Sequence, residues 1–493
     1  MIAVRSPASG ELLAEVPELG TQEVAELARR ARDAQPEWEA LGFEGRAAVL
    51  RALARALIDD SAALIETIVS ETGKAYDDAQ LIELGYAVSA LSFWATHGAG
   101  FLRERRRLAR SPLVAGRRLV TYWAPRGLVG VIGPWNYPLL NSFGDAIPAL
   151  AAGNSVLLKP SDLTPLTSLF VARKLAQCGL PEGVFGVATG GAATGEALVD
   201  HVDFVMFTGS TATGREVAAR AARSLTPCSL ELGGKDALIV LEGAHLERAA
   251  NVAVFYAMLN GGQSCISIER VYVAASIHDE FLAKVTAKVA ALRVGAPGAP
   301  GAVDVGAITS EEQLAVIESH VADAVAKGAR VAVGGQRADA PAGRFYLPTV
   351  LAGVDHSMRC MTEETFGPTL PVMAVSGEEE AVALVNDSPM GLSAAVFARS
   401  TADGERIARR LRVGAVCVND AAVNYFALEA PMGGLGESGI GVRHGPEGIR
   451  KYCTARTIVL TPRGAPNREP QFYPHSRRSA RLVRTLIRFL YRR

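Results

Sequence analysis

The chain has 493 residues, of which 49% are hydrophobic and 21% charged, and 51 basic residues balance 51 acidic ones. A chain of this length exceeds one hydrophobic core and predicts about two to four domains. The six cysteines are scattered without a CxxC pair, which argues against a zinc site and a disulfide framework, so no metal is expected. No run reaches the roughly 20 apolar residues that a membrane span requires.

The expected location is the cytoplasm. Scattered cysteines fit a reducing compartment. Residues 1–7 lack the charged, then apolar, then small-residue order of a signal peptide.

Residues 21–105 predict helices, because alanine, leucine and arginine dominate and apolar residues recur at a spacing of three to four. From residue 127, short apolar runs alternate with helical stretches. The predicted strands span 128–132, 155–158, 184–187, 204–207 and 237–241, and the predicted helices span 139–152, 166–178 and 214–222. This alternation predicts a parallel sheet covered by helices on both faces.

A second unit of the same kind is predicted after residue 233. Strands are expected at 271–273, 331–333 and 372–375, and a helix at 278–292. The expected fold class is therefore α/β, with two doubly wound parallel-sheet domains. Two less regular arms, 107–125 and the segment after 452, stand apart from this pattern, and 457–460 in the second arm predicts a strand.

Cys265 and Glu231 are the leading candidates for chemistry. Cys265 follows the glycine pair Gly261 and Gly262, and Glu231 opens a second glycine-rich turn. A thiolate is a strong nucleophile, and a carboxylate beside it can serve as a base. The alternative is a structural thiol and a solvated surface carboxylate.

Further candidates follow predicted strands, at the sheet edge where ligands bind in open α/β folds. Asn136 follows the strand 128–132 and can donate a hydrogen bond to an oxyanion, although such a residue is more often part of an ordinary turn. The segment 207–214 opens a helix whose N–H groups can hold a phosphate, although its glycine spacing is not GxGxxG. Segment 159–162 can bind ribose hydroxyls, and 363–368 forms a third such turn.

Together, these motifs resemble the NAD(P)-dependent aldehyde dehydrogenase superfamily, in order over about residues 5–460. The resemblance implies a cofactor domain, a catalytic domain and a small β bridging domain that pairs subunits into a homodimer or homotetramer. The implied ranges are 1–106 and 126–233 for the NAD-binding domain, 234–432 for the catalytic domain, 107–125 and 453–470 for the bridging arms, and 471–493 for a basic tail.

The resemblance also implies roles for individual residues. Cys265 would attack the aldehyde, Asn136 and the Cys265 N–H would hold the oxyanion, and Glu231 would activate the water that hydrolyses the thioester. The implied cofactor contacts are Trp135, Lys159, Ser161, Asp162, Gly209, Ser210, Glu364 and Phe366.

NAD is the expected cofactor, and NADP remains an alternative. Asp162 lies where many NAD-preferring relatives carry an acid, which would accept a hydrogen bond from the ribose 2′-hydroxyl and repel a 2′-phosphate. Many relatives also carry a second glutamate in the segment that corresponds to 439–445, and this chain has none there. Glu231 is therefore expected to act alone as the base.

The substrate is expected to be an apolar aldehyde. Segments 265–270 and 430–434 resemble succinate-semialdehyde dehydrogenases, whose substrate carboxylate calls for an arginine, but this chain has Gly144 at the matching place. An apolar wall is predicted from Leu139, Leu140, Phe143, Tyr425 and Phe426. Succinate-semialdehyde oxidation, acyl transfer to coenzyme A and a non-catalytic relative remain alternatives, and Glu231 disfavours the acyl transfer.

The C-terminal residues 477–493 contain seven arginines and no acid, which leaves the rest of the chain with a net charge of −7. In a helix, apolar residues from Leu482 to Leu490 would share one face, with arginines opposite. This pattern predicts an interfacial helix at an anionic membrane surface, or a helix that packs on protein. Nucleic acid is not an expected partner, because aromatic residues are sparse.

Overall fold

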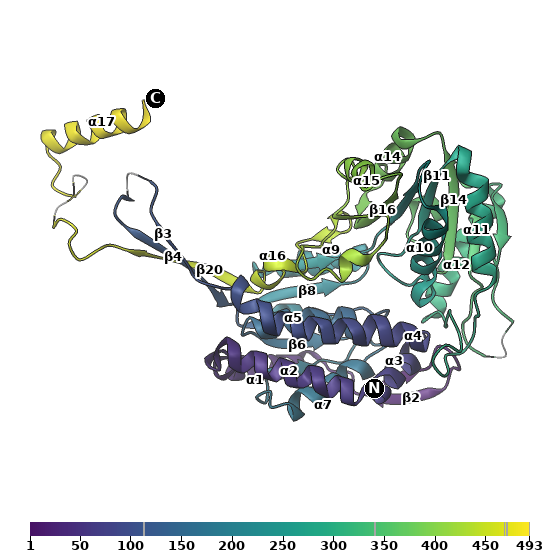
Figure 1. The fold of residues 1–493 in the computed structure, drawn as a ribbon. Coiled ribbons are helices and arrows are strands. Elements are labelled where there is room, and N and C mark those ends of the chain that lie inside the picture. The colour runs from purple at the N-terminus through teal and green to yellow at the C-terminus, as the bar shows by residue number, and fades with distance from the viewer. Residues whose placement is uncertain (112–113, 340–341, 468, 470–471, 493) are drawn as a thin grey trace. The chain divides into compact units, whose positions relative to one another are not determined.

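The computed structural model describes residues 1–111, 114–339, 342–467, 469 and 472–492. The chain forms two compact units, the first made of residues 1–101 and 125–452 and the second of 102–124 and 453–493 (Figure 1). The first unit contains two large, mainly parallel sheets surrounded by helices. The second contains a small sheet and a C-terminal helix.

The first large sheet has six strands. Their order is β19 (Gly439–Ile440), β9 (Cys228–Glu231), β8 (Phe204–Thr208), β5 (Leu128–Ile132), β6 (Ser155–Lys159) and β7 (Phe185–Val187). All neighbours are parallel except β19, which pairs antiparallel with β9. Every residue of β5, β6 and β8 is buried, as expected for parallel strands covered on both faces, which explains their continuous apolar runs.

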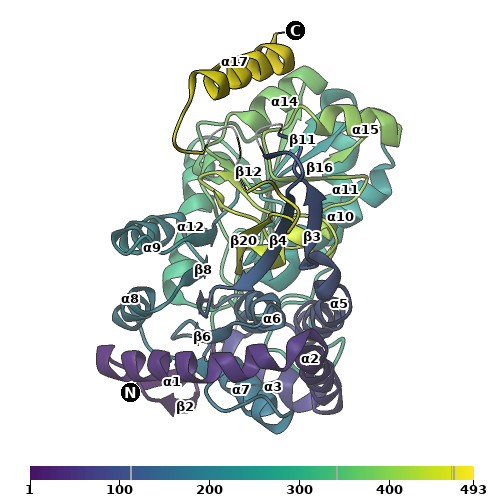
Figure 2. The same cartoon turned by 90° about the vertical axis from the view of Figure 1, so that its left-hand side faces the viewer.

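Helices cover both faces of this sheet, as Figure 2 shows around β6 and β8. On one face, α1 (Thr21–Ala40), α8 (Ala192–His201) and α9 (Thr211–Arg223) share a core with the strands. On the other lie α5 (Gly85–Phe101), α6 (Gly144–Ala151) and α7 (Leu166–Gln177), with α2 (Gly42–Asp59) and α3 (Ser61–Thr72) packed against them.

The strand order reverses at β5. The chain runs from β5 through β6 to β7 on one side, and then returns to place β8 and β9 on the other side. Loops that leave the carboxyl ends of β5 and β8 therefore diverge. In open α/β sheets this switch point is where ligands bind.

The second large sheet has seven strands. Their order is β12 (Arg330–Val333), β13 (Thr349–Ala352), β14 (Thr369–Val375), β11 (Arg270–Ala274), β10 (Ala237–Val240), β16 (Ser393–Phe397) and β17 (Ala415–Val418). Only the edge strand β12 is antiparallel to its neighbour.

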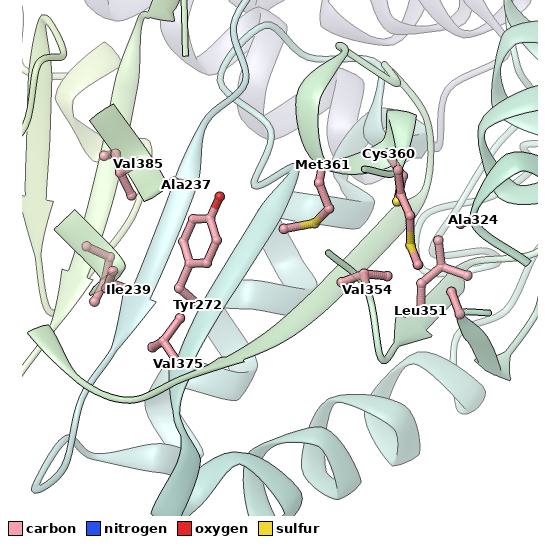
Figure 3. Packing of buried hydrophobic residues seen from close by; sticks show 14 of the residues in the cluster. Ala237, Ile239, Tyr272, Ala324, Leu351, Val354, Cys360, Met361, Val375 and Val385 are labelled. Atoms are coloured by element: carbon pink, nitrogen blue, oxygen red, sulfur yellow. The ribbon is translucent and has the colours of Figure 1, made fainter. Parts of the chain in front are cut away.

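Two helix layers also enclose this sheet. Tyr272 and Ile239 face α12 (Glu311–Ala326), α14 (Glu378–Asn386) and α15 (Thr401–Ala408), in the core that Figure 3 shows. Alternate residues of the same strands, such as Leu238 and Val271, face α10 (Leu246–Met258) and α11 (His278–Ala290). Both faces of the sheet are therefore buried, as expected for a mainly parallel sheet.

The second unit holds a three-stranded sheet in the order β20 (Cys453–Leu460), β4 (Arg118–Pro125) and β3 (Arg105–Leu108), followed by α17 (Arg477–Tyr491). The shorter elements of the first unit are β1 (Ile2–Arg5), β2 (Leu12–Val16), α4 (Tyr76–Asp78), α13 (Arg359–Thr362), β15 (Met390–Gly391), β18 (Leu435–Gly436) and α16 (Gly445–Arg450). Within the described residues, no helix combines the length and apolarity needed to cross a membrane.

The predicted fold class is confirmed, and the local differences have physical reasons. The expected helix 139–152 is a π-helical turn, η3 (Pro138–Phe143), that continues into α6. Strands β9, β13, β16 and β17 were not predicted, because their small or polar residues weaken the apolar signal. In β9, for example, Ser229 and Glu231 are buried polar residues.

Candidate active site

Cys265 lies in the turn between the short helix η4 (Leu259–Gly262) and strand β11. The three residues Asn260, Gly261 and Gly262 all have left-handed backbone angles, with φ of 54°, 64° and 71°. A Cβ on Gly262 would lie 2.0 Å from the carbonyl oxygen of Gly367, so only glycine fits there. The glycine pair therefore packs the cysteine loop tightly against a neighbouring loop.

The second glycine pair, Gly233 and Gly234, lies against the same cysteine loop. A Cβ on Gly234 would lie 2.5 Å from the carbonyl oxygen of Cys265. Among the described residues, no hydrogen-bond acceptor engages the Cys265 N–H, which leaves this donor available to a bound ligand.

Asn136 follows strand β5 and is buried beside the cysteine loop. Its side-chain Nδ2 donates to the carbonyl of Gln263 at 2.9 Å, which orients the amide. Its own carbonyl accepts from Lys74 Nζ at 2.8 Å and from Asn260 Nδ2 at 3.1 Å. Both the side chain and the backbone of Asn136 are thus held by hydrogen bonds.

Lys74 forms a fully buried ion pair with Glu83, with Nζ and Oε1 2.5 Å apart. Glu83 also accepts from the N–H groups of Leu139 and Leu140, at 3.0 and 2.8 Å. The pair therefore fixes the turn that carries Asn136. Neither residue was predicted from the sequence, although Glu83 stands alone as a charge in the apolar run 81–84.

Glu231 ends strand β9 and is buried, with 3% of its surface exposed. Neither carboxylate oxygen has a hydrogen-bond partner among the described residues, and the Arg443 guanidinium lies 3.8 Å away. Burial raises the pKa of Glu231 to about 7, while the charges of Arg443 and Lys451 oppose the rise. A carboxylate of this kind can accept a proton near neutral pH.

Arg443 lies at the centre of a buried charge cluster. It donates two hydrogen bonds to Asp145, at 2.9 and 2.7 Å, and one to the Thr208 hydroxyl. Lys451 is also close, and burial lowers its pKa. Asp145 and Arg443 were not singled out from sequence, because two charges so far apart in the chain form no local pattern.

His444 adds no charge to this cluster. Burial lowers its pKa to about 3, so the ring is neutral, and Nε2 lies 3.0 Å from the Tyr86 hydroxyl. Its backbone has φ of 60°, a conformation that non-glycine residues adopt mainly where surrounding structure enforces it.

The Cys265 thiol is neutral in this arrangement. Burial raises its pKa to about 12, although the charge of Arg443 lowers it. The thiol and Glu231 line one cavity of about 280 Å³. Its other sequence-predicted lining residues are Trp135, Asn136, Gly209, Ser210, Glu364 and Phe366.

The turn with Glu364 and Phe366 precedes strand β14. Glu269 accepts from the N–H groups of Thr365 and Phe366, both at 2.8 Å, and pairs with Lys235 at 2.6 Å. Phe366 has φ of 52°, and its ring meets that of Trp135 edge to face with centroids 5.4 Å apart. A second buried ion pair, like that of Lys74, therefore positions this turn.

Lys159 ends strand β6 and lines a separate cavity of about 630 Å³ beside α8 and α9. Burial lowers its pKa, and its ammonium has no acceptor among the described residues. Ser161 donates to Asp162 at 3.3 Å, and neither is among the described lining residues of the two cavities. Ser210 caps α9, since its hydroxyl accepts from the Thr213 N–H at 3.3 Å.

A narrow apolar cavity of about 30 Å³ lies on the other side of Cys265. No charged side chain lines it within the part of the chain that the structure describes. Its described lining residues are Ile82, Tyr137, Leu140, Asn141, Tyr256, Leu259, Ser264, Cys265, Ile266, Ala422, Tyr425 and Phe426.

The predicted apolar wall is correct for Leu140, Tyr425 and Phe426 and wrong for Leu139 and Phe143. The ring of Phe143 packs against Phe185 instead, with centroids 6.0 Å apart, and Leu139 is fully buried. Leu139 and Phe143 lie four residues apart on η3 and both point away from the cavity, whereas Leu140 lines it.

Comparison with known proteins identifies the family. The family model described as "Aldehyde dehydrogenase family" matches residues 1–458. A protein of Mycobacterium ulcerans (strain Agy99), provisionally named an NADP succinate-semialdehyde dehydrogenase, is 43% identical over 454 residues, which cover 92% of this chain and 87% of the relative. The 4,4′-diapolycopene aldehyde oxidase of Methylomonas sp is 37% identical over 494 residues, which cover 99% and 91%.

Solved structures identify the same family. The crystal structure of a Mycobacterium tuberculosis aldehyde dehydrogenase complexed with NAD+ superimposes with a TM-score of 0.89 and is 36% identical. The match covers 93% of this chain and 94% of that one. This chain therefore belongs to the aldehyde dehydrogenase family, as an oxidoreductase that oxidises an aldehyde with NAD or NADP as the acceptor.

Proposed function

We propose that the protein oxidises an apolar aliphatic or aromatic aldehyde to its carboxylic acid. The observation that carries this proposal is the uncharged wall of the narrow cavity beside Cys265, which offers aliphatic and aromatic side chains and, among the described residues, no cation for a substrate carboxylate. Burial of an apolar chain against such a wall is favourable, whereas an unpaired carboxylate there is costly. The relative named 4,4′-diapolycopene aldehyde oxidase is compatible with the same substrate class.

In the proposed reaction, the Cys265 sulfur attacks the aldehyde carbon and its proton passes to Glu231. The C=O bond becomes an oxyanion, which accepts hydrogen bonds from Asn136 Nδ2 and the Cys265 N–H. The side-chain amide of Asn136 is oriented by the Gln263 carbonyl, and Lys74 holds the Asn136 backbone carbonyl. This supports the role, because a preorganised donor needs no rearrangement.

When bound, the nicotinamide supplies the acceptor for the hydride that leaves the substrate carbon. Loss of that hydride re-forms the C=O bond and leaves a thioester on Cys265. Glu231 releases the thiol proton to solvent and then takes a proton from water, whose oxygen attacks the thioester carbon. The C–S bond breaks to release the acid, and the departing Cys265 thiolate takes the proton back from Glu231. The raised pKa of Glu231 suits a base that works near neutral pH.

The residues around the two larger cavities fit a dinucleotide, which supports assignment of 1–106 and 126–233 to the cofactor and of 234–432 to the substrate. Lys159 offers a buried ammonium that lacks an acceptor among the described residues, as expected for a donor to ribose hydroxyls. Gly209 and Ser210 at the start of α9 would hold phosphate, and Glu364, Phe366 and Trp135 add proposed contacts from the same cavity. Ser161, which follows Lys159 on the loop after β6, is a further proposed contact.

We propose a preference for NAD over NADP. Asp162 would repel a 2′-phosphate. Arg220, which lines the Lys159 cavity, is already held by Asp200 at 2.9 and 2.6 Å and by Glu196 at 2.5 Å. A guanidinium neutralised by two carboxylates is a poor partner for an added phosphate.

Succinate-semialdehyde oxidation is the second candidate, because relatives with up to 43% identity carry that name. It requires a cation that reaches the substrate carboxylate. Arg443 is buried against Asp145 and does not line the narrow cavity, so it does not meet this requirement.

The bridging arms 107–125 and 453–470 are proposed to pair subunits into a dimer or tetramer, since β20 is an edge strand with an exposed face. We also propose a cytoplasmic protein that associates peripherally with anionic membranes through 477–493. An apolar aldehyde partitions into lipid, so such an association would bring the enzyme to its substrate.

The deciding experiment measures reduction of NAD and, separately, of NADP by absorbance with acetaldehyde, hexanal, dodecanal, benzaldehyde and succinic semialdehyde. We expect kcat/KM to be higher with the apolar aldehydes than with succinic semialdehyde, and higher with NAD than with NADP. A strong preference for succinic semialdehyde would overturn the apolar assignment. The control pair is Cys265→Ala, which should abolish activity, and Cys228→Ala, which removes a thiol outside the proposed site and should not.

A further inference from the structure

The two units of the chain carry opposite charge. The second unit, residues 102–124 and 453–493, contains 17 arginines, two glutamates and neither lysine nor aspartate. The first unit is left with 34 basic and 49 acidic residues. The net charge is therefore +15 for the 64 residues of the second unit and −15 for the first unit, and these sum to zero for the whole protein.

The two acids of the second unit are each paired within it. Glu104 lies 2.7 Å from Arg106, and Glu469 lies 2.6 Å from Arg117. The remaining described arginines of this unit have no acidic partner inside it. Strand β3 alone presents three consecutive exposed arginines, Arg105 to Arg107.

Helix α17 adds an apolar face to this positive surface. Ser476 caps its N-terminus, since the Ser476 hydroxyl accepts from the Ser479 N–H at 3.0 Å, and none of the described residues of the helix is buried. Phe489 is 82% exposed and Ile487 is 48% exposed. At 100° per residue, the apolar side chains and the arginines of the helix occupy opposite sides.

The apolar face of α17 borders an open groove of about 570 Å³ within the second unit. Val483, Leu486, Ile487 and Leu490 form one wall, and residues of the segment 461–466 form the other. The unit's own core does not fill this groove. The helix thus keeps an apolar face that a partner can cover.

We propose that the second unit, hairpin and helix together, is a docking surface for an anionic phospholipid bilayer. Arginines of β3 and α17 would bind headgroup phosphates, and the apolar face of α17 would lie among the acyl chains. Docking would give the enzyme access to an aldehyde dissolved in the lipid, and this purpose rests on the proposed function, the oxidation of an apolar aldehyde. The docking itself does not depend on that reaction.

Charge and chemistry favour this partner. The planar guanidinium binds phosphate through two parallel hydrogen bonds, and each basic residue near an anionic bilayer strengthens binding about fivefold. An arginine side opposite an apolar side is the arrangement that lies in a membrane interface. The phosphates of a nucleic acid would also bind the arginines, but such a partner would leave Phe489 and Ile487 exposed to water.

The test is flotation of the full-length protein with phosphatidylcholine vesicles that contain or lack phosphatidylglycerol. We expect binding only to the anionic vesicles, weakened by salt. A matched pair tests the helix. Leu486→Asp places a charge on the apolar face and should weaken binding about 100-fold, whereas Thr485→Asp makes the same charge change on the other side and should weaken it about fivefold.

A second matched set tests the hairpin. Replacement of Arg105, Arg106 and Arg107 by glutamine should weaken vesicle binding about 100-fold, and replacement of the same three by lysine, which keeps the charge, should weaken it far less. Equal binding by the glutamine variant would confine docking to the helix and overturn the proposal for the unit as a whole.

Three outcomes would overturn the proposal. They are failure of the full-length protein to float with anionic vesicles, binding to duplex DNA without binding to vesicles, and a Leu486→Asp variant that dissociates the oligomer but floats normally. The last outcome would make a second copy the occupant of the groove. Hexanal turnover, measured alongside, reports on the proposed chemistry and separates its failure from failure of the docking.

Discussion

Arginine occupies two opposite settings in this chain. In the first unit, Arg443 is buried and has two specific acidic neighbours, Asp145 at 2.7 Å and Glu231 at 3.8 Å. In the second unit, arginines such as Arg481 and Arg484 lie on a helix whose described residues are not buried. A buried charge acts through one or two specific partners, because the low dielectric strengthens each contact. Exposed charges of one sign act together, and salt screens them.

This contrast predicts how each region responds to substitution. Loss of one buried charge should disturb stability or turnover strongly, since its partner is left uncompensated. Loss of one exposed arginine should disturb neither, while loss of several should change association with an anionic surface.

Glu231→Gln should lower steady-state turnover by about 10²–10⁴-fold, because the amide cannot take a proton from water. In the wild type, turnover should rise with pH through about 7 as Glu231 loses its proton. The variant should lose this dependence. Rapid mixing should still show some reduced cofactor before the steady state, and an unchanged pH profile would contradict the role of Glu231.

Arg443→Met should lower the free energy of unfolding by about 3–5 kcal/mol, because Asp145 would remain as a buried charge without its guanidinium. Chemical denaturation measures this change. Removal of the positive charge should also move the rise of the pH–turnover profile to higher pH, since Arg443 lowers the pKa of Glu231. A profile that stays in place would show that Arg443 acts only on structure.

Glu83→Gln tests the buried pair that holds the turn of Asn136. The amide keeps the shape of the side chain but leaves the Lys74 ammonium without its countercharge. We expect a loss of about 1–3 kcal/mol in stability and about tenfold in kcat, with little change in KM for NAD. The exposed Glu66 provides the matched control as Glu66→Gln, which should change neither quantity. Equal turnover by the folded Glu83→Gln variant would remove Glu83 from the positioning of Asn136.

The smallest effect on stability and turnover is expected for Arg484→Ala. Loss of this single arginine of α17 should change the free energy of unfolding by less than about 0.5 kcal/mol and leave hexanal turnover unchanged. Thermal unfolding and the absorbance assay measure both. A large loss of stability would mean that α17 packs on protein. The arginines of the second unit would then not differ from the buried Arg443 of the first unit in the way described above.

Much of the fold was predictable, because the buried parallel strands are continuous apolar runs separated by helical stretches. β5 and β6 lie where the sequence placed them, within about one residue at each end. Strands with polar or mixed sequences, such as β9, were missed, because their burial comes from neighbours distant in the chain. Leu139 and Phe143 were misplaced because apolar residues surround this fully buried segment, so its sequence does not show which side faces the cysteine.

The candidates for the chemistry were identifiable before the fold was known, since Cys265, Glu231 and Asn136 stand in short glycine-rich or strand-end motifs that are local properties of the chain. The charge of the second unit follows from its composition. The partners of the buried charges, in contrast, are visible only in the folded chain. Lys74 reaches Asn136 across 62 positions, and Asp145 meets Arg443 across 298. Such pairs leave no local pattern, because the low dielectric that makes them matter exists only once the chain has folded.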